Sequence, residues 1–492
     1  MRGEQGVEDG LARARAGEVG IDAGRIEAFL DDAAGAGLNL HSLMLHRRGH
    51  VAFETHRWPY GDGRPRIMHS VAKSFTACAI GMALEEGRFA LGDPVVEFFP
   101  AERPAVVGDN LAAMTIADLL TMRTGHAEET SGSRWRSMRS SWIEAFFKIP
   151  VVYRPGTVYT YTSAASYMLS AILTRTTGQT LHDYLRPRLF EPLGIVGERW
   201  DIGPDGINPG GNGLKCRTVD ILKLGVLHAQ RGDWNGRRIL TEGWVAAATR
   251  AHSDSGYGYH WMAGPDRTYA AMGVFGQLVV VFADHDATLA ITSGVNGENA
   301  CSETILPLVY RHFQGAFQDA VLPPSEAEAH LRQRAVAAAS IERMVSLTAP
   351  ARERALLTYD IADNPQGITR LRLTLEAGSC SLQLTDADGE HTLEMGVDGW
   401  IESDADMPGR ELHHGYELRP ARVVAGARWL DPCTLEMHWI FAETAFRDTV
   451  LCRFEADRVS VTRSVNVNSG PLGYPVLSGR RVTPRPAGAS AV

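Results

Sequence analysis

The sequence of 492 residues predicts an α+β domain followed by a separate, small all-β domain. Strand-like segments lie on both sides of a long, mostly helical stretch, which is typical of an α+β arrangement. Beyond residue 351 the pattern changes to short runs that alternate apolar and polar residues, as in a β-barrel or β-sandwich. A length well above that of one average domain agrees with this division.

The first predicted elements are two strands and a helix. His41 to His56 reads as two strands joined by a turn at Arg48 and Gly49. Apolar residues then recur at helical spacing over residues 70–87, and Gly87 is placed to end that helix. These elements predict that residues 70–87 form a largely buried helix.

Residues 94–199 are expected to be mostly helical. Thr115 is placed as the cap of one helix, and the segment "SYMLSAILTRTTGQ" has a glycine near its end. Strands return at "GYGYHWMAG" and at residues 275–294, where a continuous apolar run predicts a buried strand. We expect the strands from both ends to meet in one antiparallel sheet.

The composition then changes to alanine, glutamate and arginine in "LPPSEAEAHLRQRAVAAASIERM". Two prolines before a polar helical pattern indicate a helical linker. The predicted organisation is therefore an α+β domain over residues 1–316, a helical linker over 317–350 and a β-barrel or β-sandwich over 351–492.

Charge and cysteine usage narrow the function classes. A net charge of −9 gives no reason to expect nucleic acid as a partner, and no apolar run approaches the roughly 18 residues of a membrane span. The first twenty residues lack a secretory pattern, and six scattered cysteines without CxxC spacing predict reduced thiols and no metal site. His413 and His414 are adjacent, so on a strand their side chains would face opposite sides and would not bind one metal ion together. No GxGxxG occurs, so no dinucleotide site is expected. Together with the lack of a secretory pattern and of a membrane span, these observations predict a cytoplasmic protein, and we expect no cofactor.

A serine and a lysine three residues apart are the strongest chemical signal. Only four of the 49 basic residues are lysine, and one of them, Lys73, follows Ser70 by three positions at the start of the predicted helix. This spacing places both side chains on one helix face. A serine hydroxyl needs a base, and lysine can lose its proton when buried, whereas arginine cannot. The alternative is that Ser70 caps the helix and Lys73 is solvated.

The surroundings of this pair resemble the serine β-lactamase and penicillin-binding-protein superfamily, whose first motif is S-x-x-K. Four blocks follow in family order: "HSVAKSFTACAIGMALEEGRFALGDPVVEFFP", "MTIADLLTMRTGH", "RPGTVYTYTSAASYMLSAILTRTTGQTLHDYLRPRLFEPLGI" and "GGNGLKCRTVDILKLGVLHAQRGDWNGRRIL". The resemblance implies a β-lactamase-like domain, with an antiparallel sheet flanked by helices and an all-helical region.

The resemblance also implies roles for three residues of the third block. In "YTS", Tyr161 matches the family's catalytic tyrosine, and Ser163 stands where an asparagine is usual. The phenol of Tyr161 would be stabilised as a phenolate beside an ammonium and pass a proton from Ser70 to the leaving group. Ser163 and Tyr159 are expected to contact substrate, and packing in the core is an equal alternative for Tyr159.

The third family motif is altered. In "AMGVFGQ", Ala271 and Met272 stand where the family has lysine or histidine and then threonine. Gly273 matches the motif glycine, and Val274 would supply an oxyanion N–H together with that of Ser70. Gly273 and Phe275 are expected beside the substrate. The missing cation argues against an efficient β-lactamase, because the family uses it to hold a carboxylate.

The sequence therefore predicts a serine hydrolase that cleaves a small ester or linear amide through an acyl-enzyme on Ser70. The altered third motif resembles the branch of 6-aminohexanoate-dimer hydrolases and carboxylesterases. Two alternatives stay open: a D-amino-acid peptidase or weak β-lactamase, and a non-catalytic penicillin-binding-like scaffold. A small-molecule substrate is the expected partner, without nucleic acid or membrane, and a homo-oligomer is compatible with the sequence.

Overall fold

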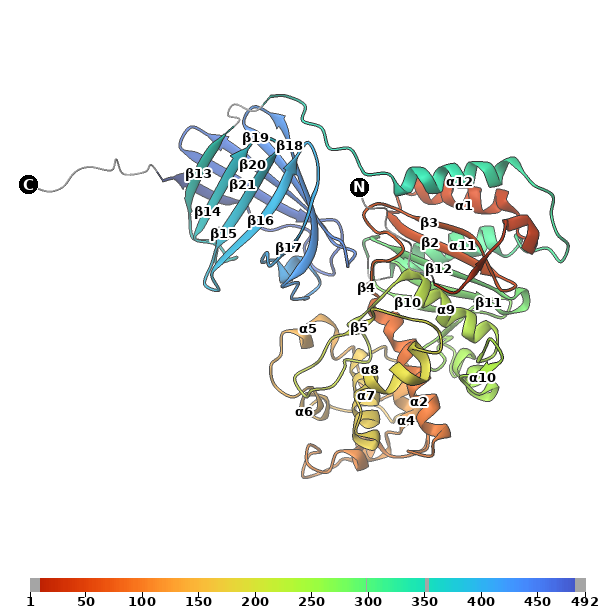
Figure 1. Cartoon of the computed structure of the whole chain (residues 1–492). Coiled ribbons are helices and arrows are strands. Elements are labelled where there is room, and N and C mark those ends of the chain that lie inside the picture. Colours follow the sequence, from red (N-terminus) through yellow and green to blue (C-terminus); the bar gives the residue numbers. More distant parts are fainter. Residues whose placement is uncertain (1–8, 298, 350–353, 483–492) are drawn as a thin grey trace, which may run out of the picture. The chain divides into compact units, whose positions relative to one another are not determined.

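The computed structural model describes residues 9–297, 299–349 and 354–482. The chain divides into two compact units, Met1–Ser340 and Ile341–Val492 (Figure 1). The first unit contains a mixed helix and sheet arrangement, and the second is built from strands. The predicted α+β class with a C-terminal β-barrel is confirmed.

The central sheet of the first unit joins strands from both ends of the domain. Its order is β1-β3-β2-β12-β11-β10-β9, and all neighbours are antiparallel except β1 and β3. The antiparallel pairing of β2 with β12 brings strands from the two ends of the domain into one sheet, as predicted. The strands are β1 Ala12–Arg13, β2 Leu40–Arg47, β3 His50–His56, β9 Met262–Ala263, β10 Thr268–Gly273, β11 Gln277–Phe282 and β12 Ala287–Ser293.

Helices cover both faces of this sheet (Figure 1). The terminal helices α1, α11 and α12 pack together with β3 on one side, and α9 packs on β2, β11 and β12. Strand β11 is apolar after its first residue because both of its faces are buried. Val279 and Val281 pack in the core on one face of the sheet, and Leu278 and Val280 pack in the core on the other. The helices are α1 Ala23–Gly35, α9 Thr218–Ala229, α11 Leu306–Phe313 and α12 Glu326–Ala339.

The middle of the chain forms the helical region, as predicted. Thr115 caps α4 and accepts a hydrogen bond from the Asp118 backbone N–H at 3.3 Å, while Gly178 ends α7 in the left-handed conformation with φ 72°. The helices are α2 Ala72–Glu85, α3 Asp109–Ala113, α4 Ile116–Leu120, α5 Gly132–Arg136, α6 Trp142–Phe147, α7 Ser163–Thr177, α8 Leu181–Leu185 and α10 Glu242–Thr249.

Short elements complete the first unit. A three-stranded sheet of order β4-β6-β5 leads into the start of α2. Its strands are β4 Arg66–Ile67, β5 Arg199–Trp200 and β6 Leu214–Cys216, and a separate hairpin joins β7 Asp233–Trp234 to β8 Arg237–Arg238. The strand expected in "GYGYHWMAG" is reduced to the two residues of β9. Within the described residues, no helix is both long and apolar enough to cross a membrane.

The second unit is a closed nine-stranded barrel. Its order is β16-β15-β14-β13-β22-β21-β20-β19-β18, and a parallel pairing of β16 with β18 closes it, while β17 adds to β18. Alternate residues of strands such as β14 and β15 are buried, which explains the period-two sequence. The strands are β13 Ala355–Ile361, β14 Arg370–Glu376, β15 Ser379–Thr385, β16 Glu390–Val397, β17 Ile401–Ala405, β18 Ala421–Asp431, β19 Thr434–Phe441, β20 Arg447–Glu455, β21 Arg458–Val465 and β22 Leu477–Arg481.

The helical linker predicted over residues 317–350 differs from the structure. Its helix, α12, packs on α1 and β3 and belongs to the first unit, and the second unit begins at Ile341. A helix with an alanine-rich, weakly apolar face reads as a spacer in sequence, although it covers the sheet in the fold. The predicted boundary at residues 350 and 351 lies outside the described residues.

Candidate active site

The candidate nucleophile lies on a tight turn at the start of α2. Strand β4 leads into a 3-10 turn, His69–Val71, which continues directly into α2. The backbone N–H of Met68 donates to the carbonyl of Leu214 at 2.8 Å and fixes the entry of this turn. His69 has a φ of 48°, in the left-handed region that is unusual for a residue with a side chain. Ser70 keeps part of its surface exposed, as a nucleophile requires.

Lys73 is buried directly behind Ser70. Its Nζ lies 2.9 Å from Ser70 Oγ, 3.0 Å from Ser163 Oγ and 3.0 Å from the carbonyl oxygen of Gly211. Only 1% of the lysine surface is exposed. Burial lowers the pKa of Lys73 to about 7; the charge of Glu129 acts in the opposite direction. The amine can therefore lose its proton near neutral pH.

The three contacts of Lys73 favour proton transfer from Ser70. A neutral amine has two donors and one lone pair. The Gly211 carbonyl can only accept a hydrogen bond, and the Ser163 hydroxyl can accept the second. The lone pair is then left for the proton of Ser70, so the geometry suits a general base.

Ser163 and Gly211 thus position the lysine. Ser163 is the first residue of α7 and is buried, and its contact is with Lys73 rather than with an open surface. This differs from the substrate contact that we predicted for Ser163. A Cβ at Gly211 would lie 3.3 Å from Lys73 Nζ, so the absence of a side chain permits the close approach of its carbonyl.

Tyr161 completes the group around the serine. Lys73 Nζ lies 4.8 Å from the centre of the Tyr161 ring. Burial raises the pKa of Tyr161 well above its usual value, and a hydrogen bond with Ser70 opposes this only in part. Burial and the nearby charge of Glu129 both raise the pKa of Tyr161 and therefore favour the protonated phenol over the phenolate that we predicted.

Two further tyrosines and a histidine surround this group. Tyr159 is half-buried, with its ring centre 5.5 Å from that of Tyr257, and Tyr257 lies 6.2 Å from Tyr161. His260 Nε2 is 3.1 Å from Ser166 Oγ, so it ties its loop to α7. Burial lowers the pKa of His260 to about 3, and the nearby Lys73 charge acts in the same direction. His260 is therefore neutral and supports the site without acting as a base.

Strand β10 lies against the nucleophile turn. A Cβ at Gly273 would lie 2.6 Å from the carbonyl oxygen of Met68, so only glycine permits this approach. Val274 follows Gly273 directly and begins the turn between β10 and β11. Ala271 and Met272 pair with Val279 and Leu278 of β11, and neither carries a charge or a hydroxyl.

Phe275 occupies a different place from the one expected. Its ring is completely buried and packs edge-on against His69, with ring centres 5.4 Å apart. Its φ is 65°, and its carbonyl accepts hydrogen bonds from the Ser293 hydroxyl at 2.9 Å and the Val295 N–H at 3.1 Å. A side chain without exposed surface supports the turn between β10 and β11, so our prediction of a substrate contact for Phe275 is not supported.

Sequence reasoning missed Gly211, Tyr257 and His260. Gly211 contributes through its backbone, which no residue type signals. The "GGNG" segment around it did mark a family block, and Tyr257 and His260 lie in the segment that we assigned only as a strand. In the described part of the chain, no group of three or more His, Cys, Asp or Glu side chains is arranged to hold a metal ion.

Comparison with known proteins assigns the family. Residues 42–309, more than half of the chain, match the family described as Beta-lactamase. The chain belongs to the Beta-lactamase family. Among curated proteins, the 6-aminohexanoate-dimer hydrolase of Paenarthrobacter ureafaciens is 22% identical over 235 residues, which are 44% of this chain and 60% of that protein. The chain thus spans less than two thirds of that relative's length.

Solved structures share the fold of this Beta-lactamase family member. A protein from Bacillus anthracis, provisionally assigned as a 6-aminohexanoate-dimer hydrolase, is 16% identical with a TM-score of 0.53, over 66% of this chain and 88% of that one. EstCE1, a hydrolase with promiscuous acyltransferase activity, is 17% identical with a TM-score of 0.50, over 60% of this chain and 98% of that one. The family and these neighbours are hydrolases, and at this identity the structures show the fold alone.

Proposed function

We propose that this protein is a serine hydrolase that cleaves a small ester or linear amide through an acyl-enzyme on Ser70. One observation carries the proposal: a buried amine with a pKa near 7 lies 2.9 Å from the hydroxyl of a partly exposed serine. A lysine with only a structural role gains nothing from a lowered pKa next to a serine hydroxyl. A general base that takes a proton near neutral pH requires both the lowered pKa and the short distance.

Acylation begins with proton transfer. The neutral Lys73 amine takes the proton of Ser70, and Oγ attacks the carbonyl carbon of the substrate. The carbonyl π electrons move onto oxygen, and the backbone N–H groups of Ser70 and Val274 stabilise the resulting oxyanion. As the intermediate collapses, Tyr161 gives its proton to the leaving alcohol or amine and recovers one from the Lys73 ammonium.

Deacylation reverses the roles. The Lys73 amine, through Tyr161 or directly, takes a proton from a water molecule that attacks the acyl carbon. The bond between that carbon and Ser70 Oγ breaks, and Oγ regains a proton from Lys73. The acid product leaves with the oxygen of water. This sequence of steps needs no metal ion or cofactor.

The residues of β10 support the substrate class. Ala271 and Met272 provide no charge or hydroxyl for a substrate carboxylate. The half-buried Tyr159 offers an aromatic surface against Tyr257, which also contacts Tyr161. These features favour a substrate whose acyl part is uncharged, such as a short ester or linear amide, over a β-lactam.

A fluorophosphonate probe tests the nucleophile and the base. We expect labelling of the wild type, none of Ser70→Ala, and at least hundredfold slower labelling of Lys73→Arg, because a guanidinium keeps its proton. Lys223 is the matched control, since it is equally buried and donates to the Gly194 carbonyl at 3.0 Å. Labelling of Lys223→Arg at the wild-type rate supports a specific role for Lys73. Unchanged labelling of Ser70→Ala would refute the proposal.

A substrate panel separates the remaining alternatives. We expect hydrolysis of p-nitrophenyl esters of short acids to exceed that of a chromogenic cephalosporin and of D-alanyl amides. A faster cephalosporin rate would favour a β-lactamase and contradict the inference from Ala271. A faster D-alanyl amide rate would favour a D-amino-acid peptidase. No labelling and no turnover in any arm would favour a non-catalytic scaffold.

A further inference from the structure

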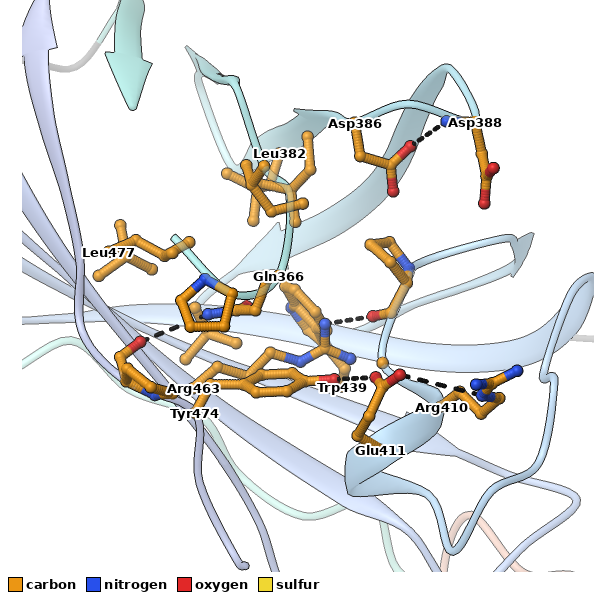
Figure 2. A pocket seen from close by; sticks show the side chains of 18 of the residues that line it. Gln366, Leu382, Asp386, Asp388, Arg410, Glu411, Trp439, Arg463, Tyr474 and Leu477 are labelled. Carbon is orange, nitrogen blue, oxygen red and sulfur yellow. Dashed lines mark hydrogen bonds and ion pairs between the residues drawn. The ribbon is translucent and has the colours of Figure 1, made fainter. Parts of the chain in front are cut away.

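The barrel of the second unit contains a cavity. Its volume is about 410 Å³, and it opens among loops at one end of the barrel (Figure 2). Leu382 and Asp386 lie on one side of it, and Tyr474 and Glu411 on the other. Its lining is mixed, with charged and polar side chains mainly from the loops and apolar side chains from inward positions of four strands and one loop. The apolar side chains are Ile368, Leu382, Leu384, Val450, Val461 and Leu477.

The size and construction of the cavity distinguish it from a packing defect. Protein interiors contain few voids larger than one water molecule, whereas small-molecule sites occupy about 300–1,000 Å³. The loops around the opening are fixed by polar contacts. Arg419 Nη1 lies 3.1 Å from Asp388 Oδ2, and the Tyr474 hydroxyl donates to Glu411 Oε2 at 2.6 Å. A space with apolar side chains on its strand walls and a fixed polar rim is the usual form of a ligand site.

Polar groups on the inner wall indicate what the ligand carries. Trp439 is completely buried, and its indole N–H has no hydrogen-bond partner within the described residues. A buried donor without a partner is costly, and an acceptor on a ligand would remove that cost. Arg463 lies over the Trp439 ring at 4.8 Å, but its charge is already balanced by the buried Asp448, whose Oδ2 accepts from Arg463 Nε at 2.7 Å. An uncharged acceptor therefore fits this wall better than a carboxylate.

We propose that the barrel binds a small, uncharged, largely apolar molecule whose hydrogen-bond acceptor faces Trp439. This site lies wholly inside the second unit and is separate from the Ser70 site. The proposal stands on the cavity, the apolar side chains that its strands contribute, and an indole N–H without a partner in the described part of the chain. It does not depend on whether the first unit is a hydrolase.

A dye titration with the full-length protein tests the cavity. Nile red is uncharged and largely apolar, has a carbonyl acceptor, and shifts its emission on entering an apolar site. Leu384→Trp fills the cavity, and we expect it to weaken dye binding at least tenfold. Ser381→Trp adds the same group on the outward side of the same strand and should leave the affinity unchanged. Equal affinity of the two variants would overturn the proposal.

Two further measurements check that each variant folds and that the dye accepts a hydrogen bond from Trp439. Circular dichroism and thermal unfolding check each variant, and Val461→Phe on β21 replaces Leu384→Trp if the latter does not fold. Trp439→Phe removes the N–H, so Nile red should bind about fivefold more weakly. Diphenylhexatriene, a hydrocarbon without an acceptor, should be unaffected by that change. Equal weakening of both dyes would overturn the assignment of an acceptor at Trp439.

Discussion

The pH dependence of acylation follows directly from the environment of Lys73. Burial lowers its pKa to about 7, so about half of the molecules carry the neutral amine at pH 7. An ordinary lysine would be neutral in only about 3 molecules in 10,000 at that pH. At pH 5 the neutral fraction falls to about 1%. We therefore expect kcat/KM to fall about 50-fold between pH 7 and pH 5 and to level off above about pH 8.

The assay is hydrolysis of p-nitrophenyl acetate under kcat/KM conditions, followed at the isosbestic wavelength of p-nitrophenol so that titration of the product does not enter. The high pKa of Tyr161 predicts no falling limb below strongly alkaline pH. A flat profile down to pH 5, or a midpoint above pH 9, would refute the role of Lys73 as the base. Lys223→Arg should retain the wild-type profile.

The remaining predictions concern positioning, stability and the barrel. Ser163→Ala removes one hydrogen bond to Lys73, so kcat/KM should fall about fivefold to tenfold in the same ester assay, and an unchanged value would exclude a positioning role. The folded pKa of Lys73 lies below its unfolded value of 10.5, so the folded state binds fewer protons between pH 7 and 10.5. Relative to Lys73→Met, the wild type should gain up to about 1.4 kcal/mol in unfolding free energy per pH unit there, measured by urea denaturation. Gly273→Ala adds a Cβ 2.6 Å from a carbonyl oxygen of the nucleophile turn and should lower kcat/KM at least tenfold, whereas Gly243→Ala enters open space and should not. Asp448→Asn leaves a buried cation unpaired, so the barrel should lose about 3–5 kcal/mol of unfolding free energy in denaturant, and a smaller loss than 1 kcal/mol would contradict that pairing.

The predicted elements that held depend on local signals. The Thr115 cap, the glycine that ends α7 and the alternating strands of the barrel are each recognisable within a few residues. Local geometry also brings Ser70 and Lys73 together, because residues three apart lie on the same side of a helical segment. The predictions that failed concerned the contacts and orientation of a side chain or helix, which depend on residues distant in the sequence.

Phe275 illustrates such a failure. Its motif placed it beside the nucleophile, and the structure agrees with that proximity. The side chain nevertheless turns into the core, because a φ of 65° and two hydrogen bonds to its carbonyl hold the turn in that orientation. The direction of a side chain on a turn depends on backbone angles and long-range contacts that no local pattern contains.

The linker helix is a second example. Residues 326–339 have the alanine-rich, weakly amphipathic composition of a spacer, and the prediction of a helix there was right. Its attachment to α1 and β3 arises from the N-terminal and C-terminal segments meeting across the sheet. Composition identifies a helix, but its neighbours are selected by the topology of the sheet.

The sequence by itself determined the order of elements, the change from helix and sheet to a barrel, and the pairing of a serine with a nearby lysine. Periodicity and short spacing carry that information, because they depend on backbone geometry over a few residues. Only the tertiary structure decided that the lysine titrates near pH 7, that the tyrosine stays protonated, and that the barrel encloses a cavity. Each of these depends on how much water is excluded around a group, and water is excluded by residues distant in the chain.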